Sequence, residues 1–121
     1  MTTETLENIH QSCLRARADG ATITRGEWGV LLAPLSEPHA DLLAYRLNDA
    51  RQCCAIGAAL IGRRGSYLWG ITTDAAQALQ LPLLYVEGVL SGFDAVPIPD
   101  EHSNEYMTGF EHGQELARRL L

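Results

Sequence analysis

The sequence predicts an all-α fold, a compact bundle of five to seven short helices with at most one small β pair. Apolar residues recur at spacings of three and four in several stretches, which is typical of helices that bury one face. The stretch 51–62 is apolar almost all round, which favours a helix at the centre of the bundle. Capping residues and prolines mark several helix ends. With 121 residues, 46 % of them hydrophobic, the chain is expected to form one domain, 1–121.

A first amphipathic helix is expected over residues 4–18. Its apolar stripe comprises Leu6, Ile9, Cys13 and Ala16. Arg15 and Arg17 lie in the last turn, where a positive charge suits the helix dipole. Asp19-Gly20 is predicted to end this helix, because glycine readily adopts a left-handed backbone conformation.

The next helix is expected to begin at Thr24, where Thr24-Arg25-Gly26-Glu27 matches a capping box. A short strand over 21–24 is the alternative. A third helix is expected to open at Ser36-Glu37-Pro38, since serine caps helices and proline is tolerated in the first turn. The central helix then spans 51–62.

Three further helices are predicted in the second half. The first begins at the capping pair Thr73-Asp74 and runs to about Gln80, the second runs from Pro82 to about Ser91, and Ser103 or Asn104 caps the last, over 105–120. The stripe of the last helix comprises Tyr106, Phe110, Gly113, Ala117 and Leu120. Gly109 and Gly113 are one turn apart, so they are expected to form a groove that another backbone can approach.

The charge is unevenly distributed. The nine basic residues are all arginines, and the formal net charge is −6. Residues 1–64 hold seven acids and seven arginines, whereas residues 65–117 hold eight acids and neither arginine nor lysine. An acidic surface repels phosphate backbones and suits basic protein partners, although acids also simply keep a protein soluble. The absence of lysine excludes Schiff-base chemistry and a Walker-type phosphate site.

Two groups of residues are candidate contact sites. Aromatic, methionine and glycine residues of the last helix are enriched where helices or subunits meet, so they form a possible interface: Tyr106, Met107, Gly109, Phe110 and Gly113. Packing of this helix on its own core is the alternative. Arg63 and Arg64, in the turn before Gly65-Ser66, form a possible anion contact, although they also suit a solvated helix end.

No pattern in the sequence predicts a catalytic, cofactor or metal site. Cys13, Cys53 and Cys54 lack CxxC spacing and are expected to be reduced, buried thiols. The four histidines do not occur in metal-binding motifs, and the acidic loop 94–102 lacks the spacing of a calcium loop. We therefore expect no cofactor and no metal, and leave a Cys/His or anion-site enzyme as a third possibility.

Residues 75–93 also fit a helix-turn-helix. In a DNA-binding version the second helix enters the major groove with basic or amide side chains. Here it offers Tyr85, Glu87 and Ser91, and its carboxylate would be repelled by the phosphates. DNA binding is therefore the alternative function, and a structural helix corner is favoured over it.

Two segments, CCAIGAALIG at 53–62 and LQLPLLYVEGVLSGFD at 79–94, resemble parts of small uncharacterised bacterial and phage proteins. Those proteins combine a Cys-hydrophobic-Gly-Ala helix with a helix ending in Gly-Phe-Asp and a Tyr/Phe-Gly tail, as at Tyr106 to Gly113. The similarity covers about a third of the chain. It implies a regulatory or phage-associated protein and carries no catalytic residues.

The sequence as a whole favours a small acidic protein that binds another protein, with a second copy of the chain as one candidate partner. No stretch reaches the roughly 18 apolar residues of a membrane-spanning helix, and the acidic start MTTETLENIH does not resemble a signal peptide. A cytoplasmic location with no membrane partner is expected.

Overall fold

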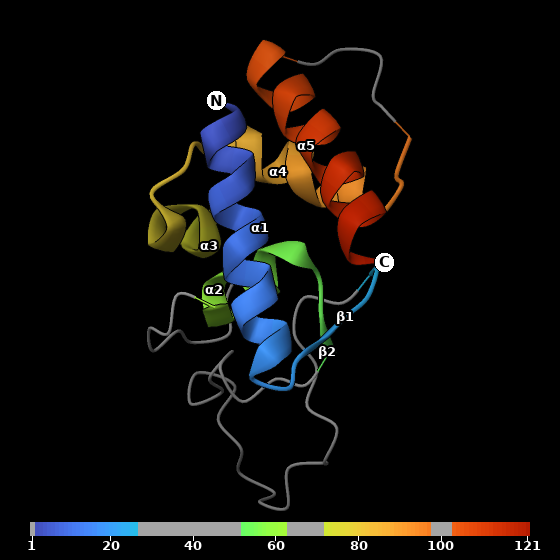
Figure 1. The fold of residues 1–121 in the computed structure, drawn as a ribbon. Coiled ribbons are helices and arrows are strands. Elements are labelled where there is room, and N and C mark those ends of the chain that lie inside the picture. Colours follow the sequence, from blue (N-terminus) through green and yellow to red (C-terminus); the bar gives the residue numbers. More distant parts are fainter. Residues whose placement is uncertain (1, 27–51, 63–71, 98–102) are drawn as a thin grey trace, which may run out of the picture.

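The computed structural model describes residues 2–26, 52–62, 72–97 and 103–121. These residues form five helices and one two-stranded parallel sheet (Figure 1). In chain order the elements are α1 (Thr3–Ala18), β1 (Thr22–Ile23), β2 (Gln52–Cys53), α2 (Ala55–Gly62), α3 (Thr72–Leu79), α4 (Leu83–Phe93) and α5 (Asn104–Leu120). The predicted all-α bundle with one small β pair is confirmed.

The helices form two closely packed pairs. α4 packs along α5, and α1 packs along α2. α2 also contacts α3, α4 and α5, and all eight of its residues are buried. Figure 1 shows α1 and α5 next to each other, with α3 on the opposite side of α1. The apolar stretch therefore does lie at the centre of the bundle, as its composition predicts.

The predicted helix over 51–62 is wrong at its start, because Gln52–Cys53 forms β2 and α2 begins only at Ala55. β2 runs parallel to β1, with Gln52 opposite Thr22 and Cys53 opposite Ile23. Two cysteines and a glutamine follow each other here, and pairing with a distant strand satisfies their backbone groups before the helix begins. Local apolar composition gives no sign of that distant partner.

The residue between strand and helix, Cys54, closes the first turn of α2. The Gly57 N–H lies 3.5 Å from the Cys54 sulfur and donates to it. A cysteine therefore takes the place that serine or aspartate usually occupies at a helix start. The site is 2 % exposed, so the thiol satisfies a backbone donor that water cannot reach.

The helix predicted to begin at Thr24 is also wrong at its start, and the alternative short strand is confirmed. The Thr24 N–H donates to the Cys53 carbonyl at 2.9 Å, which extends the ladder of β1 and β2. Gly26 then has a φ of 77°, outside the helical range that the second position of a capped helix needs. The predicted third helix, opening at Ser36, lies outside the described residues.

The other predicted helix ends agree to within one or two residues. Gly20, with a φ of 104°, follows the end of α1. Ser103 caps α5, because its hydroxyl accepts the Tyr106 N–H at 3.1 Å. Gln80 leaves the helical region with a φ of 58° and separates α3 from α4, so the helix corner before Pro82 is present.

Candidate functional site

The predicted contact surface lies on α5, and the structure divides it into a buried and a partly exposed part. Gly109, Phe110 and Gly113 are buried, whereas Tyr106 and Met107 are half-buried. A Cβ atom on Gly109 would lie 2.2 Å from the carbonyl oxygen of Tyr85, and one on Gly113 would lie 2.2 Å from that of Val89. The groove that the glycine spacing predicts therefore exists, and α4 of the same chain fills it.

Glycines of α4 make the matching contacts from the other side. A Cβ atom on Gly88 would lie 2.2 Å from the Tyr106 carbonyl oxygen, and one on Gly92 would lie 2.1 Å from that of Phe110. Later residues of α4 meet later residues of α5, so the two helices run in the same direction. Each helix thus supplies two glycines four residues apart, and this lets the backbones approach more closely than any side chain would permit.

At the partly exposed end of α5, the rings of Tyr106 and Phe110 stack with their centroids 6.5 Å apart. Phe110 is only 5 % exposed. Of the predicted contact surface, Tyr106 and Met107 are thus the residues that retain solvent exposure in the described structure. Arg63 and Arg64, the possible anion contact, lie outside the described residues.

The three cysteines are free thiols buried in the core. The Cys13 thiol donates to the Ala55 carbonyl at 3.2 Å. Burial raises the pKa of Cys53 to about 12 and that of Cys54 to about 11, and it raises the pKa of Cys13 as well. The thiols therefore stay protonated near neutral pH, which disfavours a nucleophilic role.

The described histidines contact side chains other than the thiols. The Tyr85 hydroxyl lies 2.7 Å from Nδ1 of His112, and the two rings meet edge to face with centroids 5.6 Å apart. Burial lowers the pKa of His112, so the neutral ring can accept the phenol proton in a hydrogen bond. His10 lies beside Glu7 and Arg119. Within the described ranges, no group of three or more His, Cys, Asp or Glu residues could hold a metal ion.

The second helix of the possible helix-turn-helix is largely buried. Tyr85, which that interpretation would place near DNA, is 0 % exposed. The most exposed apolar side chains of α4 are Leu83 and Leu84, at 39 % and 43 %, and Glu87 is half-buried. Residues 83–93 contain no arginine or lysine, so α4 presents leucines and a carboxylate instead of the donors that DNA requires.

Three arginines of the first 26 residues each bind the end of a different helix. Arg15 donates from Nε to the Gly62 carbonyl of α2 at 2.9 Å, and Arg25 donates from Nε to the Phe93 carbonyl of α4 at 2.8 Å. Arg17 donates to the Leu120 carbonyl of α5. Carbonyls in the last turn of a helix lack partners within it and carry the negative end of the dipole, so they attract cations.

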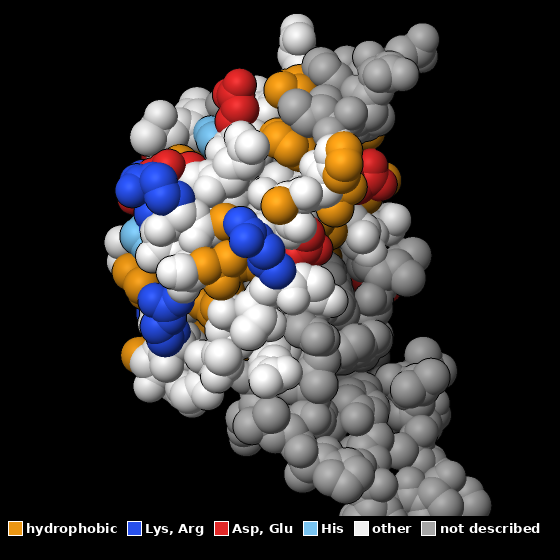
Figure 2. Space-filling model, turned by 90° about the vertical axis from the view of Figure 1, so that its right-hand side faces the viewer, with side chains coloured by type: hydrophobic (Ala, Val, Ile, Leu, Met, Phe, Trp, Pro, Cys, Tyr) orange, Lys and Arg blue, Asp and Glu red, His pale blue; other side chains and the backbone are white. Residues whose placement is uncertain are grey.

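This finding changes the predicted role of Arg15 and Arg17. Their place in the last turn of α1 predicts that they stabilise that helix, whereas their guanidinium groups reach the ends of α2 and α5. Figure 2 shows that the described arginine side chains lie at separate places on the face that carries the C-terminal end of α5. The positive charge of Arg15, Arg17 and Arg25 is therefore distributed over three helix ends.

Several acidic residues of α4 and α5 have no ion-pair partner among the described arginines. Glu115 is paired with Arg118 and Arg119, both from its own helix. Glu105 and Glu111 are exposed and Glu87 is half-buried, and no described arginine lies within ion-pair distance of these three. We take these three carboxylates as the candidate interaction site and call them the acidic surface (Glu87, Glu105 and Glu111).

Comparison of the chain with known protein families, curated proteins and solved structures found no significant match. The resemblance of residues 53–62 and 79–94 to small bacterial and phage proteins therefore stays a prediction. In the described part of the chain, no helix is both long and apolar enough to cross a membrane.

Proposed function

We propose that this chain is a protein-binding domain with a regulatory role, and that its partner presents a basic surface to the acidic surface. The observation that carries the proposal is the use of Arg15, Arg17 and Arg25 on backbone carbonyls. These cations are held at helix ends, so none of them pairs with Glu87, Glu105 or Glu111, and we expect these three carboxylates to be available to an external cation. Complementary charge of this kind guides association and selects partners.

A partner of another sequence is favoured over a second copy of the chain. Two acidic surfaces repel each other, and the glycine groove that suggests a dimer is filled within one chain. The buried, protonated thiols fit a reducing compartment, so we place the interaction in the cytoplasm.

The proposal is tested by capturing partners from a lysate of the source organism on immobilised protein. Three variants, Glu105→Gln, Glu111→Gln and the double variant, are compared with Glu4→Gln, which removes one exposed carboxylate from the charge-balanced half. We expect a basic protein on the wild-type chain, bound about fivefold more weakly for each charge removed from the acidic surface. Glu4→Gln should bind as the wild type does.

Salt provides the second arm of this test. Raising ionic strength from about 0.1 M to about 1 M shortens the screening length about threefold and should release the partner. Retention of the same protein by the double variant and at high salt would count against the proposal. So would a strictly monomeric chain in native mass spectrometry that captures no protein.

A further inference from the structure

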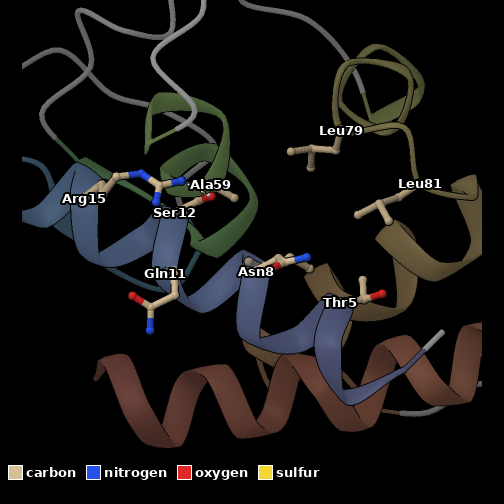
Figure 3. Close-up of a pocket in the computed structure, with 9 residues that line it drawn as sticks. Thr5, Asn8, Gln11, Ser12, Arg15, Ala59, Leu79 and Leu81 are labelled. Carbon is tan, nitrogen blue, oxygen red and sulfur yellow. Dashed lines mark hydrogen bonds between the residues drawn. The ribbon is translucent and has the colours of Figure 1, made fainter.

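A pocket of about 370 Å³ opens between α1, α2 and the turn that joins α3 to α4 (Figure 3). Its volume lies within the usual range for small-molecule sites. One wall is polar and belongs to α1, with Thr5, Asn8, Ser12 and Arg15. The opposite side is apolar, and Figure 3 shows Leu79 and Leu81 there, across from the α1 side chains.

The polar wall follows from the periodicity of α1. Thr5, Asn8, Ser12 and Arg15 each precede one residue of the buried apolar stripe, so they form a second stripe along its flank. α1 therefore turns its apolar stripe into the core and this polar stripe towards the pocket.

Arg15 is held in place at one end of the pocket. Its Nε donates to the Gly62 carbonyl at 2.9 Å and its Nη2 donates to the Ser12 hydroxyl at 3.1 Å. Ser12 is only 6 % exposed, which limits its movement. A guanidinium has five N–H donors, so three remain for a ligand, and no described carboxylate forms an ion pair with this arginine.

The apolar wall is shaped by the helix corner. Gln80 has a φ of 58°, and its neighbours Leu79 and Leu81 both line the pocket. Ala59 of α2, which is itself buried, lines the pocket as well. The pocket thus combines one fixed cation with an aliphatic surface.

We propose that this pocket binds a small amphipathic carboxylate, with its carboxylate on Arg15 and its aliphatic part against Leu79 and Leu81. A single guanidinium fork matches one carboxylate, whereas phosphate sites usually combine several cationic or backbone donors. The aliphatic wall adds affinity with each methylene that it covers. This binding is independent of the acidic surface and goes beyond the proposed function.

The test is a titration followed by ¹H–¹⁵N NMR with hexanoate, octanoate and octanamide, each below its micelle-forming concentration. Octanoate has 10 non-hydrogen atoms, and for a ligand of that size we expect a Kd of about 0.1–1 mM. The largest shifts should fall on Ser12, Arg15, Ala59, Leu79 and Leu81. Hexanoate should bind more weakly, and octanamide at least about tenfold more weakly, because it lacks the charge.

Arg15→Gln should weaken octanoate binding about tenfold, and Ala59→Leu should abolish it by filling the pocket. Arg17→Gln is the matched control, since Arg17 lies on the same helix and donates to Leu120 at the end of α5, away from the pocket lining. Circular dichroism establishes that each variant is folded. Equal binding of octanoate and octanamide, equal losses from Arg15→Gln and Arg17→Gln, or no shift at about 10 mM octanoate would overturn the proposal.

Discussion

The α4–α5 pair and the N-terminal segment, residues 3–26, both bury apolar side chains, but they differ in the contacts that add to this packing. α4 and α5 meet backbone to backbone at Gly88, Gly92, Gly109 and Gly113. The N-terminal segment packs its apolar stripe against α2, where Gly62 lies against the Ser12 backbone. Its long arginine side chains make a further set of contacts, with carbonyls at the ends of α2, α4 and α5. The α4–α5 contact depends on the absence of side chains at four glycines, whereas the contacts at the helix ends depend on the length of arginine side chains.

This difference predicts different responses to substitution. Close backbone contact leaves no room for even one methyl group. Replacing one of these glycines with alanine should therefore strongly destabilise the α4–α5 pair. The arginine contacts are separate hydrogen bonds on partly exposed side chains. Truncating one arginine at a time should therefore lower the free energy of unfolding by a small amount each time. The following experiments test this comparison, in order of decreasing effect.

The largest effect is expected from Gly109→Ala. The added Cβ would lie 2.2 Å from the Tyr85 carbonyl oxygen, which is backbone and cannot turn aside. We expect a loss of about 3 kcal/mol or more in the free energy of unfolding, measured by urea denaturation. Gln114→Ala, exposed on the same helix, should change stability by less than about 0.5 kcal/mol. A stabilised Gly109→Ala variant, as at an exposed helical glycine, would contradict the close approach.

The glycines also show how far sequence analysis can go. The spacing of Gly109 and Gly113 predicts a groove for another backbone, and the structure contains one. The spacing does not tell which backbone fills the groove, because that depends on how α4 packs against α5 in the folded chain. The buried face of α1 is predicted more completely. Four of its five buried residues belong to the predicted apolar stripe, because the spacing of apolar residues determines which face of a helix is buried, and only Ser12 is missed.

The arginine contacts and the pairing of the two strands could not be predicted in the same way, although the sequence does suggest a short strand over 21–24 as an alternative. Arg15 and Arg17 stand in the last turn of α1, and their local setting points to that helix, whereas their partners lie 47 and 103 residues away. β1 and β2 each have two residues, too few for a strand pattern, and they pair across a long stretch of chain. Contacts over such distances depend on tertiary structure. The acidic surface, in contrast, follows directly from the charge count.

The second effect in size concerns the arginines at the helix ends. Arg25→Ala and Arg17→Ala should each cost about 1–2 kcal/mol in unfolding free energy, because each removes a charged hydrogen bond to a terminal carbonyl. Arg118→Ala is the control, since Arg118 is exposed and its bonds to described residues stay within its own helix, at Glu115. It should cost less than about 0.5 kcal/mol. Equal losses in all three variants would remove the distinction between helix-end and surface arginines.

The third effect concerns the hydrogen bond between Tyr85 of α4 and His112 of α5. Among the described residues it is the only hydrogen bond that joins these two helices. Tyr85→Phe keeps the buried ring and should cost about 1 kcal/mol. Burial lowers the folded-state pKa of His112 below 6.5, so the unfolded chain takes up its proton first. This contribution is therefore present above about pH 6.5 and is lost as pH falls, which urea denaturation at pH 8 and pH 5 can measure. An unchanged His112 NMR titration in Tyr85→Phe would argue against the contact.

The smallest effect is expected where charged side chains of α1 and α5 pair with each other. Arg119 bridges Glu115 at 2.9 Å and Glu7 of α1 at 2.7 Å. Hydrogen bonds from Arg118 and Arg119 lower the pKa of Glu115 to about 2, and that of Glu7 is lowered by Arg119. The two carboxylates stabilise the fold only while they are ionised, because only the ionised forms pair with the arginines. The stabilisation is therefore present above about pH 4.5, the pKa in the unfolded chain, and is lost as pH falls towards 2.

Glu115→Gln should therefore flatten the acid limb of the stability profile between about pH 4.5 and pH 2, and salt near 1 M should reduce the difference from wild type. Glu87→Gln, which removes a carboxylate without a described arginine partner, should leave that limb unchanged. If both variants flatten it equally, the acid sensitivity reflects the total charge of the chain, and the bridge at Arg119 does not join α1 to α5 energetically. A small, salt-sensitive effect specific to Glu115 would show that this junction is the weakest of those that hold the N-terminal segment.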